Sequence, residues 1–194
     1  MLRRVQLMTM TNCIYPTTDV SIIESWFDSI SISDLSLLNF DGYIQKYNSS
    51  LTDKETVCSE STLRNILAQS PNYPATSINR KRLEQADATP LYIEHLPEGE
   101  YYMEGTGFFH YPPGGYIGWH TNSDRPGLRT YISCVEEVNK SYFRYYDANT
   151  DSIVTDWDTQ KIMVRQFRIS ADTPFWHCVG SDTNRISLGM IDIR

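Results

Sequence analysis

Apolar residues follow a helical spacing in the first half of the chain. Between residues 19 and 30 they recur every three or four positions, with an Asp or Ser available as the N-cap, so this stretch predicts an amphipathic helix. A second helix is predicted after Ser59, with Leu63, Ile66 and Leu67 on one face. We expect these helices to form a support region that packs against the structure formed by the second half of the chain.

From about residue 91 the pattern changes to short runs rich in Tyr, Phe, Ile, Val and Thr, separated by turn residues. Nine strands are predicted, at residues 91–94, 100–111, 116–120, 128–134, 141–146, 152–155, 161–169, 176–178 and 185–193. The predicted turns between them include residues 112–115, 125–127, 147–149 and 180–182. Residues 69–89 predict a loop or another short helix.

So many short strands in about 100 residues are typical of a jelly roll or a distorted barrel. We therefore predict one α+β domain over residues 1–194. Residues 1–89 are its helical support region, and residues 90–194 are a double-stranded β-helix (jelly-roll) core with the amino-terminal helices packed on one sheet. A chain of 194 residues is long enough to bury one such core.

Charge and aromatic content narrow the function. The 17 Lys and Arg against 24 Asp and Glu give a net charge of -7, which disfavours binding to a nucleic-acid backbone. The basic run at residues 79–82 indicates a solvated face. Asp156 and Asp158 are expected in a loop, where nothing nearby in the sequence supplies a partner for their carboxylates. Sixteen of the 24 aromatic residues lie between Tyr101 and Trp176, which predicts a packed, apolar pocket in the strand-rich half.

Cysteine spacing and the absence of long apolar runs indicate the expected cellular setting. Four widely spaced cysteines form no CxxC motif, so reduced thiols in the cytoplasm are expected. The amino-terminal residues lack the apolar run of a secretory signal, and no stretch approaches 18 apolar residues, so no membrane segment is expected.

Two histidines occupy positions suited to metal binding. His120 ends a predicted strand, and His177 lies in another strand 57 residues later. In a double-stranded β-helix such residues can face each other across the barrel mouth, and imidazole is a common ligand of Fe(II) and Zn(II). The spacing alone also fits a packed histidine pair. On the last predicted strand, an inward Arg185 beside the hydroxyl of Ser187 forms a fork suited to a carboxylate.

These residues resemble the Fe(II)/2-oxoglutarate-dependent dioxygenase superfamily over residues 90–194. Locally, His120-Thr121 followed by Leu128-Arg129 is similar to the aspartyl/asparaginyl β-hydroxylase branch. The resemblance implies Fe(II) held by His120 and His177, and 2-oxoglutarate as cosubstrate. Its C5 carboxylate would bind Arg185 and Ser187, and its C1 carboxylate would face Arg129. Tyr131, two residues after Arg129 on the same strand face, can also reach the cosubstrate.

The sequence departs from the family at the third ligand. The family usually carries a carboxylate two residues after the first histidine, and here Asn122 occupies that position. Three possibilities follow: Asp124 supplies the carboxylate, Asn122 ligates through its amide oxygen, or water fills the position beside two histidines. The local resemblance to the β-hydroxylase branch favours the third.

The expected function is therefore a non-haem iron, 2-oxoglutarate-dependent oxygenase in which O2 is consumed and a C–H bond of a small molecule or protein side chain is hydroxylated. One alternative is a cupin-like metalloenzyme, in which Arg185 has no role. Another is a degenerate jelly-roll binding module without iron. Neither a nucleic acid nor a membrane is an expected partner.

Overall fold

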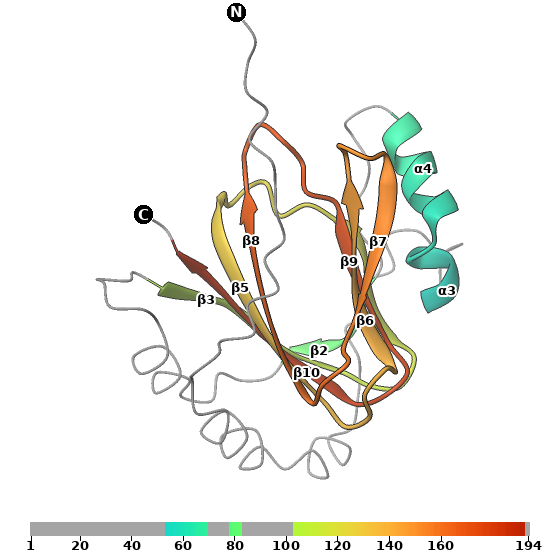
Figure 1. Cartoon of the computed structure of the whole chain (residues 1–194), viewed down its shortest axis with the longest axis vertical. Coiled ribbons are helices and arrows are strands. Elements are labelled where there is room, and N and C mark those ends of the chain that lie inside the picture. The colour runs from blue at the N-terminus through green and yellow to red at the C-terminus, as the bar shows by residue number, and fades with distance from the viewer. Residues whose placement is uncertain (1–52, 70–77, 83–102, 193–194) are drawn as a thin grey trace, which may run out of the picture.

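The fold is seen in a computed structural model that describes residues 53–69, 78–82 and 103–192 (Figure 1). The helix predicted at residues 19–30 and the strand predicted at residues 91–94 lie outside these residues. The described part is mostly β, with two helices. Most of the predicted helical support region lies outside the described residues.

Within the described residues, ten strands form two antiparallel five-stranded sheets. The first sheet has the order β1 (Ile78–Asn79), β4 (Gly115–His120), β9 (His177–Ser181), β6 (Ser141–Asp147) and β7 (Ser152–Trp157). The second has the order β2 (Lys81–Arg82), β3 (Met103–Tyr111), β10 (Arg185–Asp192), β5 (Gly127–Val135) and β8 (Ile162–Ile169).

The strand order is consistent with a core of the double-stranded β-helix kind. From β3 to β10 the chain alternates between the two sheets, except at the hairpin of β6 and β7, and the two sheets lie face to face (Figure 1). The last strand, β10, is inserted between β3 and β5. Eight of the predicted strands are confirmed within a few residues at each end.

Two local predictions were wrong. Residues 78–82 form the short strands β1 and β2 where a loop or helix was predicted, because they pair with β4 and β3 respectively. A turn was also predicted at residues 180–182, but the first two of these residues belong to β9, which continues to Ser181. Gly180 pairs with Tyr116 on one side and with Tyr142 on the other. In each case pairing with a distant strand decided the local structure.

Two helices of the described residues pack on the outer face of the first sheet, and the second of them is the helix predicted after Ser59. They are α3 (Lys54–Val57) and α4 (Glu60–Ala68), and α4 begins where the Ser59 hydroxyl accepts a hydrogen bond from the amide of Thr62 at 3.1 Å. Leu63 and Ile66 are buried against the sheet, whereas Leu67, predicted on the same face, is 41% exposed. No helix in the described ranges is long and apolar enough to cross a membrane.

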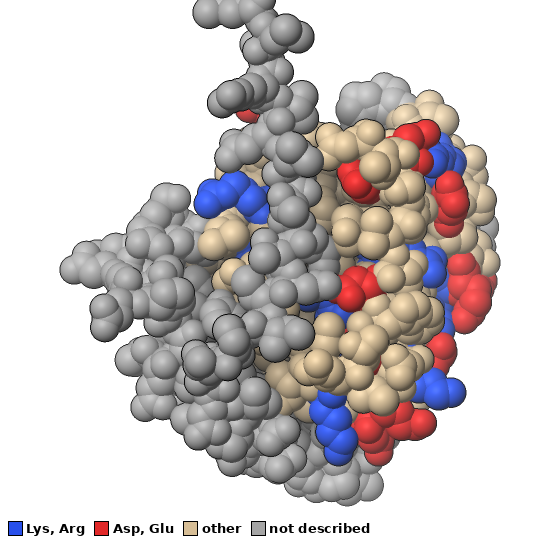
Figure 2. Space-filling view, in the orientation of Figure 1, with Lys and Arg blue, Asp and Glu red and all other residues tan. Residues whose placement is uncertain are grey.

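The space between the sheets holds the aromatic core. Its buried residues are Tyr111, Ile117, Phe143, Phe167, Ile169, Phe175 and Val179. On the side of the molecule shown in Figure 2, acidic and basic side chains of the described residues are interspersed. Part of the aromatic excess of the sequence therefore lies inside the sandwich, and another part, with Tyr116, Trp119 and Tyr142, packs against the helices.

Candidate functional site

The two predicted histidines face each other at one end of the sandwich. His120, the last residue of β4, pairs in register with His177, the first residue of β9, and their ring centroids are 4.1 Å apart. His177 is fully buried and His120 is partly buried. The rings of Phe143, Phe167 and Phe175 surround His177, with centroids 5.3, 5.5 and 5.4 Å from its own.

Backbone carbonyls select one tautomer of each imidazole in its neutral form. The Nδ1 atom of His120 lies 2.8 Å from the carbonyl oxygen of Gly118, and the Nδ1 atom of His177 lies 2.8 Å from that of Phe175. A carbonyl oxygen only accepts hydrogen bonds, so each Nδ1 carries the hydrogen and each Nε2 keeps its lone pair. Such an Nδ1–H bond to the backbone is the usual way a metal-binding histidine is oriented.

Burial keeps both rings neutral. It lowers the pKa of His177 to about 4. Burial, together with the charge that His177 would carry, lowers the pKa of His120 well below its ordinary value of 6.5. At neutral pH the pair therefore presents two uncharged nitrogen donors, which is the form that binds a divalent metal.

Asn122 lies beside this pair, at the position where the resembled family usually carries its third ligand. Its Nδ2 atom lies 3.3 Å from the Nε2 atom of His177 and 3.4 Å from the hydroxyl oxygen of Tyr131. Its backbone has a positive φ of 53°, a conformation that Asn tolerates better than most residues. Asn122 thus contacts His177, a predicted metal ligand, and Tyr131, a residue predicted to bind the cosubstrate.

The structure does not support Asp124 as the third ligand. Asp124 lines the same pocket, but the described residues contain no group of three His, Cys, Asp or Glu side chains that could hold a metal ion. The chain leaves β4 at His120 and turns at Asn122, so Asn122 rather than Asp124 meets the histidine pair.

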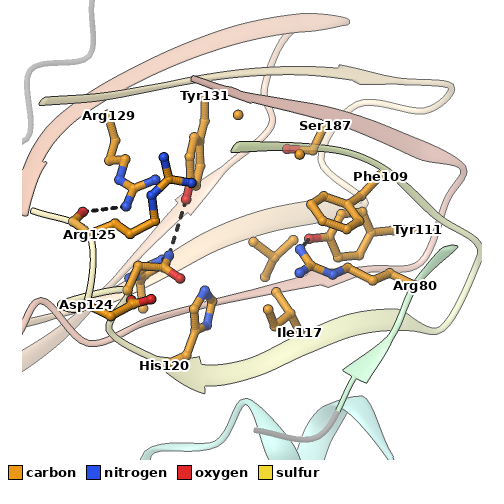
Figure 3. Close-up of a pocket in the computed structure, with 15 residues that line it drawn as sticks. Arg80, Phe109, Tyr111, Ile117, His120, Asp124, Arg125, Arg129, Tyr131 and Ser187 are labelled. Carbon is orange, nitrogen blue, oxygen red and sulfur yellow. Dashed lines mark hydrogen bonds between the residues drawn. The ribbon is translucent and has the colours of Figure 1, made fainter. Parts of the chain in front are cut away.

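These residues line a small cavity between the sheets (Figure 3). Its free volume is about 150 Å³, equal to roughly five water molecules at about 30 Å³ each. Drug-sized ligands occupy pockets of about 300 Å³ or more, so this one suits a small molecule. Of the predicted cosubstrate contacts, Arg129, Tyr131 and Ser187 line it.

Three arginines give this pocket a positive character that the net charge of the chain does not suggest. Arg129 is buried, and its Nη2 donates to the carbonyl oxygen of Arg125 at 2.6 Å. Arg125 and Arg80 also line the pocket, although neither was predicted as a site residue. Arg80 was expected on a solvated face, and that prediction was wrong because the short strands β1 and β2 carry it to the pocket wall.

Arg185 lies apart from the pocket, contrary to the prediction that it anchors a carboxylate ligand there. It is fully buried, and its Nε donates to Oδ2 of Asp158 at 2.9 Å. Arg165 binds the other oxygen of Asp158 at 2.6 Å, and it also binds Asp156 at 2.7 Å. The two aspartates therefore have partners on the later strands β8 and β10, which the sequence analysis missed because strand pairing brings these side chains together.

The chain has limited similarity to known proteins. No protein-family model matches it, and no curated protein matches it in sequence. It is similar to the crystal structure of a Pseudomonas putida prolyl-4-hydroxylase, with 19% sequence identity and a TM-score of 0.41 over 61% of this chain and 69% of that chain. At these values the similarity does not identify a family for the chain.

Proposed function

We propose that this protein is a non-haem iron, 2-oxoglutarate-dependent oxygenase that hydroxylates a C–H bond of a small molecule or a protein side chain. One observation carries the proposal: His120 and His177 face each other, neutral and oriented through Nδ1 by backbone carbonyls, at the edge of a pocket lined by three arginines. The strand order of the sheets, which brings β4 and β9 together, supports it.

The donor set fits iron. Imidazole nitrogen suits Fe(II), and here two imidazoles are already oriented by backbone carbonyls, so His120 and His177 would hold the metal. Asn122 lies beside His177 and has an amide oxygen that can act as a weak, neutral third ligand. When bound, the iron would supply the one-electron and O2 chemistry that amino-acid side chains lack.

The remaining pocket residues would bind and orient the cosubstrate. Arg129 provides a permanent positive charge for a carboxylate, and the hydroxyls of Tyr131 and Ser187 provide hydrogen-bond donors on the neighbouring strands β5 and β10. The aromatic side chains packed around His177 exclude water from the buried side of the site. The chain's own contribution is thus positioning and a dry environment.

A degenerate binding module without iron is the second candidate. It is favoured by one observation, namely that no Asp or Glu joins the two histidines among the described residues. In that case the pocket would bind a small anion through its arginines without any reaction.

Anaerobic titration with Fe(II) and 2-oxoglutarate separates the two. The oxygenase should develop a weak visible charge-transfer band, and it should form succinate from 2-oxoglutarate once O2 is admitted. His177→Ala should abolish the band, and Asn122→Asp should strengthen iron binding by adding a charged ligand. A band in Asn122→Asp but not in the wild type would favour the module. No band in either protein would refute the oxygenase.

A further inference from the structure

Arg80 lies where the chain crosses between the two sheets. The preceding strand β1 pairs with β4 of the first sheet, and the following strand β2 pairs with β3 of the second. Arg80 is the single residue between them, and it lines the pocket (Figure 3). Its position is therefore fixed by backbone pairing on both sides.

The aromatic wall of the pocket fixes the side chain of Arg80. The guanidinium carbon lies 3.5 Å from the centroid of the Phe109 ring, and Nη1 donates to the hydroxyl of Tyr111 at 2.8 Å. Phe109 and Tyr111 lie on the same face of β3, two residues apart, so together they hold the guanidinium in one orientation. A pre-oriented guanidinium loses little entropy when it binds an anion.

Its charge has no carboxylate partner within the described ranges. The guanidinium has five N–H donors, and the Tyr111 hydroxyl uses one of them. The guanidinium of Arg185, by contrast, is paired with the carboxylate of Asp158. Of the two arginines, Arg80 is thus the one with donors and charge available to a ligand in the pocket.

Positive charge lies at both ends of the pocket. Figure 3 shows Arg80 beside Tyr111 at one end, and Arg125 and Arg129 with the carboxylate of Asp124 at the other, with His120 between them. A cavity of about 150 Å³ accommodates one small ligand rather than two. A single ligand with a negative group at each end matches this arrangement.

We propose that Arg80 binds the distal carboxylate of a small dicarboxylate that extends from this residue to the histidine pair. Arg80 thereby takes the role that the sequence assigned to Arg185. The hydroxyl of Ser187, which is opposite Phe109 in the register of β10 and β3, is placed to assist. This inference rests on the proposed function, in which the dicarboxylate is 2-oxoglutarate and its keto-acid end lies at the histidines.

Two keto acids that differ only at the distal end test this assignment. 2-Oxoglutarate carries a distal carboxylate, and 2-oxopentanoate carries a methyl group in its place. Each is titrated anaerobically into the Fe(II)-loaded protein, and its Kd is measured by calorimetry. Arg80→Gln should raise the Kd of 2-oxoglutarate about 10- to 100-fold and leave that of 2-oxopentanoate unchanged. Arg80→Lys, which keeps the charge, should lose less.

Arg168→Gln is the matched control, because it removes the same charge from an exposed position on β8. It should leave both Kd values unchanged. An equal loss of both ligands in Arg80→Gln would mean that Arg80 only supports Phe109 and Tyr111, and would overturn the assignment. An unchanged Kd for 2-oxoglutarate would do so too. A wild-type protein that binds neither keto acid would instead refute the proposed function itself.

Discussion

Asp158 is the residue whose replacement should reveal most about how this fold is held together. Its carboxylate is fully buried and receives hydrogen bonds from Arg165, Arg185, Ser133 and Ser141. Asp158→Asn keeps the size and one oxygen acceptor but removes the charge. We expect this change to destabilise the protein strongly, because it leaves buried positive charge without compensation.

The magnitude follows from which arginine loses its partner. Arg165 keeps a second carboxylate, Asp156, at 2.7 Å. Arg185 has no second carboxylate among the described residues, and its Nη1 is buried without a hydrogen bond there. Leaving one buried charge unpaired costs about 3–5 kcal/mol. In a protein of this size that cost corresponds to a fall in Tm of about 6–20 °C.

The same carboxylate should shape the acid stability of the protein. Burial on its own raises the pKa of Asp158, but the charges of Arg185 and Arg165 outweigh it and hold the pKa well below the usual value of 3.8. A lowered folded-state pKa adds stability above the unfolded-state pKa, and that stability is lost as the pH falls below it. The wild type should therefore lose this contribution below about pH 4, and Asp158→Asn should lack that part of the acid dependence.

Urea unfolding followed by tryptophan fluorescence and far-UV circular dichroism measures both effects. Asp156→Asn is the matched control. Its carboxylate is 16% exposed and binds only Arg165 among the described residues, so the change should cost about 1 kcal/mol. Arg185→Met in the Asp158→Asn background should recover part of the loss, because it removes the unpaired charge. A loss below about 1 kcal/mol for Asp158→Asn would refute the reasoning.

Two further replacements test the packing around the site. Phe143→Ala, at a fully buried position stacked on His177, should cost about 3–5 kcal/mol in urea unfolding and loosen His177, and an unchanged NMR chemical shift of that imidazole would contradict this packing. Gly180→Ala should cost about 1–3 kcal/mol, because its Cβ would lie 2.5 Å from the Tyr142 hydroxyl oxygen, and unaltered thermal unfolding would contradict the close approach.

The strands were predictable because their signal is local. Alternating apolar residues and intervening turn residues marked eight of the strands, and the capped helix after Ser59 was equally readable. The strands β1 and β2 were not, since two-residue segments carry no periodicity and exist only because β4 and β3 pair with them. Such pairings are set by tertiary structure, which a local pattern does not contain.

The site was predictable only in part, for a related reason. His120, Asn122 and His177 come together because they lie at the ends of strands whose pairing follows from the strand order. Arg185 points inward as predicted, but its partner Asp158 was assigned to an unpaired loop, so the competing ion pair was missed. The placement of Arg80 depended on β1 and β2, and nothing in the basic run 79–82 distinguished a pocket residue from a solvated one.

The position of β10 has a consequence for the order in which this protein can fold. β10 lies between β3 and β5 and forms ladders with both, although it is synthesised after them. Until it emerges, each of those two strands has an unpaired edge, and the second sheet exists only as separate parts. Contacts so distant in sequence slow folding and expose strand edges to association. During synthesis the second sheet therefore cannot be completed before residues 185–192 emerge, and neither can the pocket, which Ser187 and Gly189 of β10 help to line.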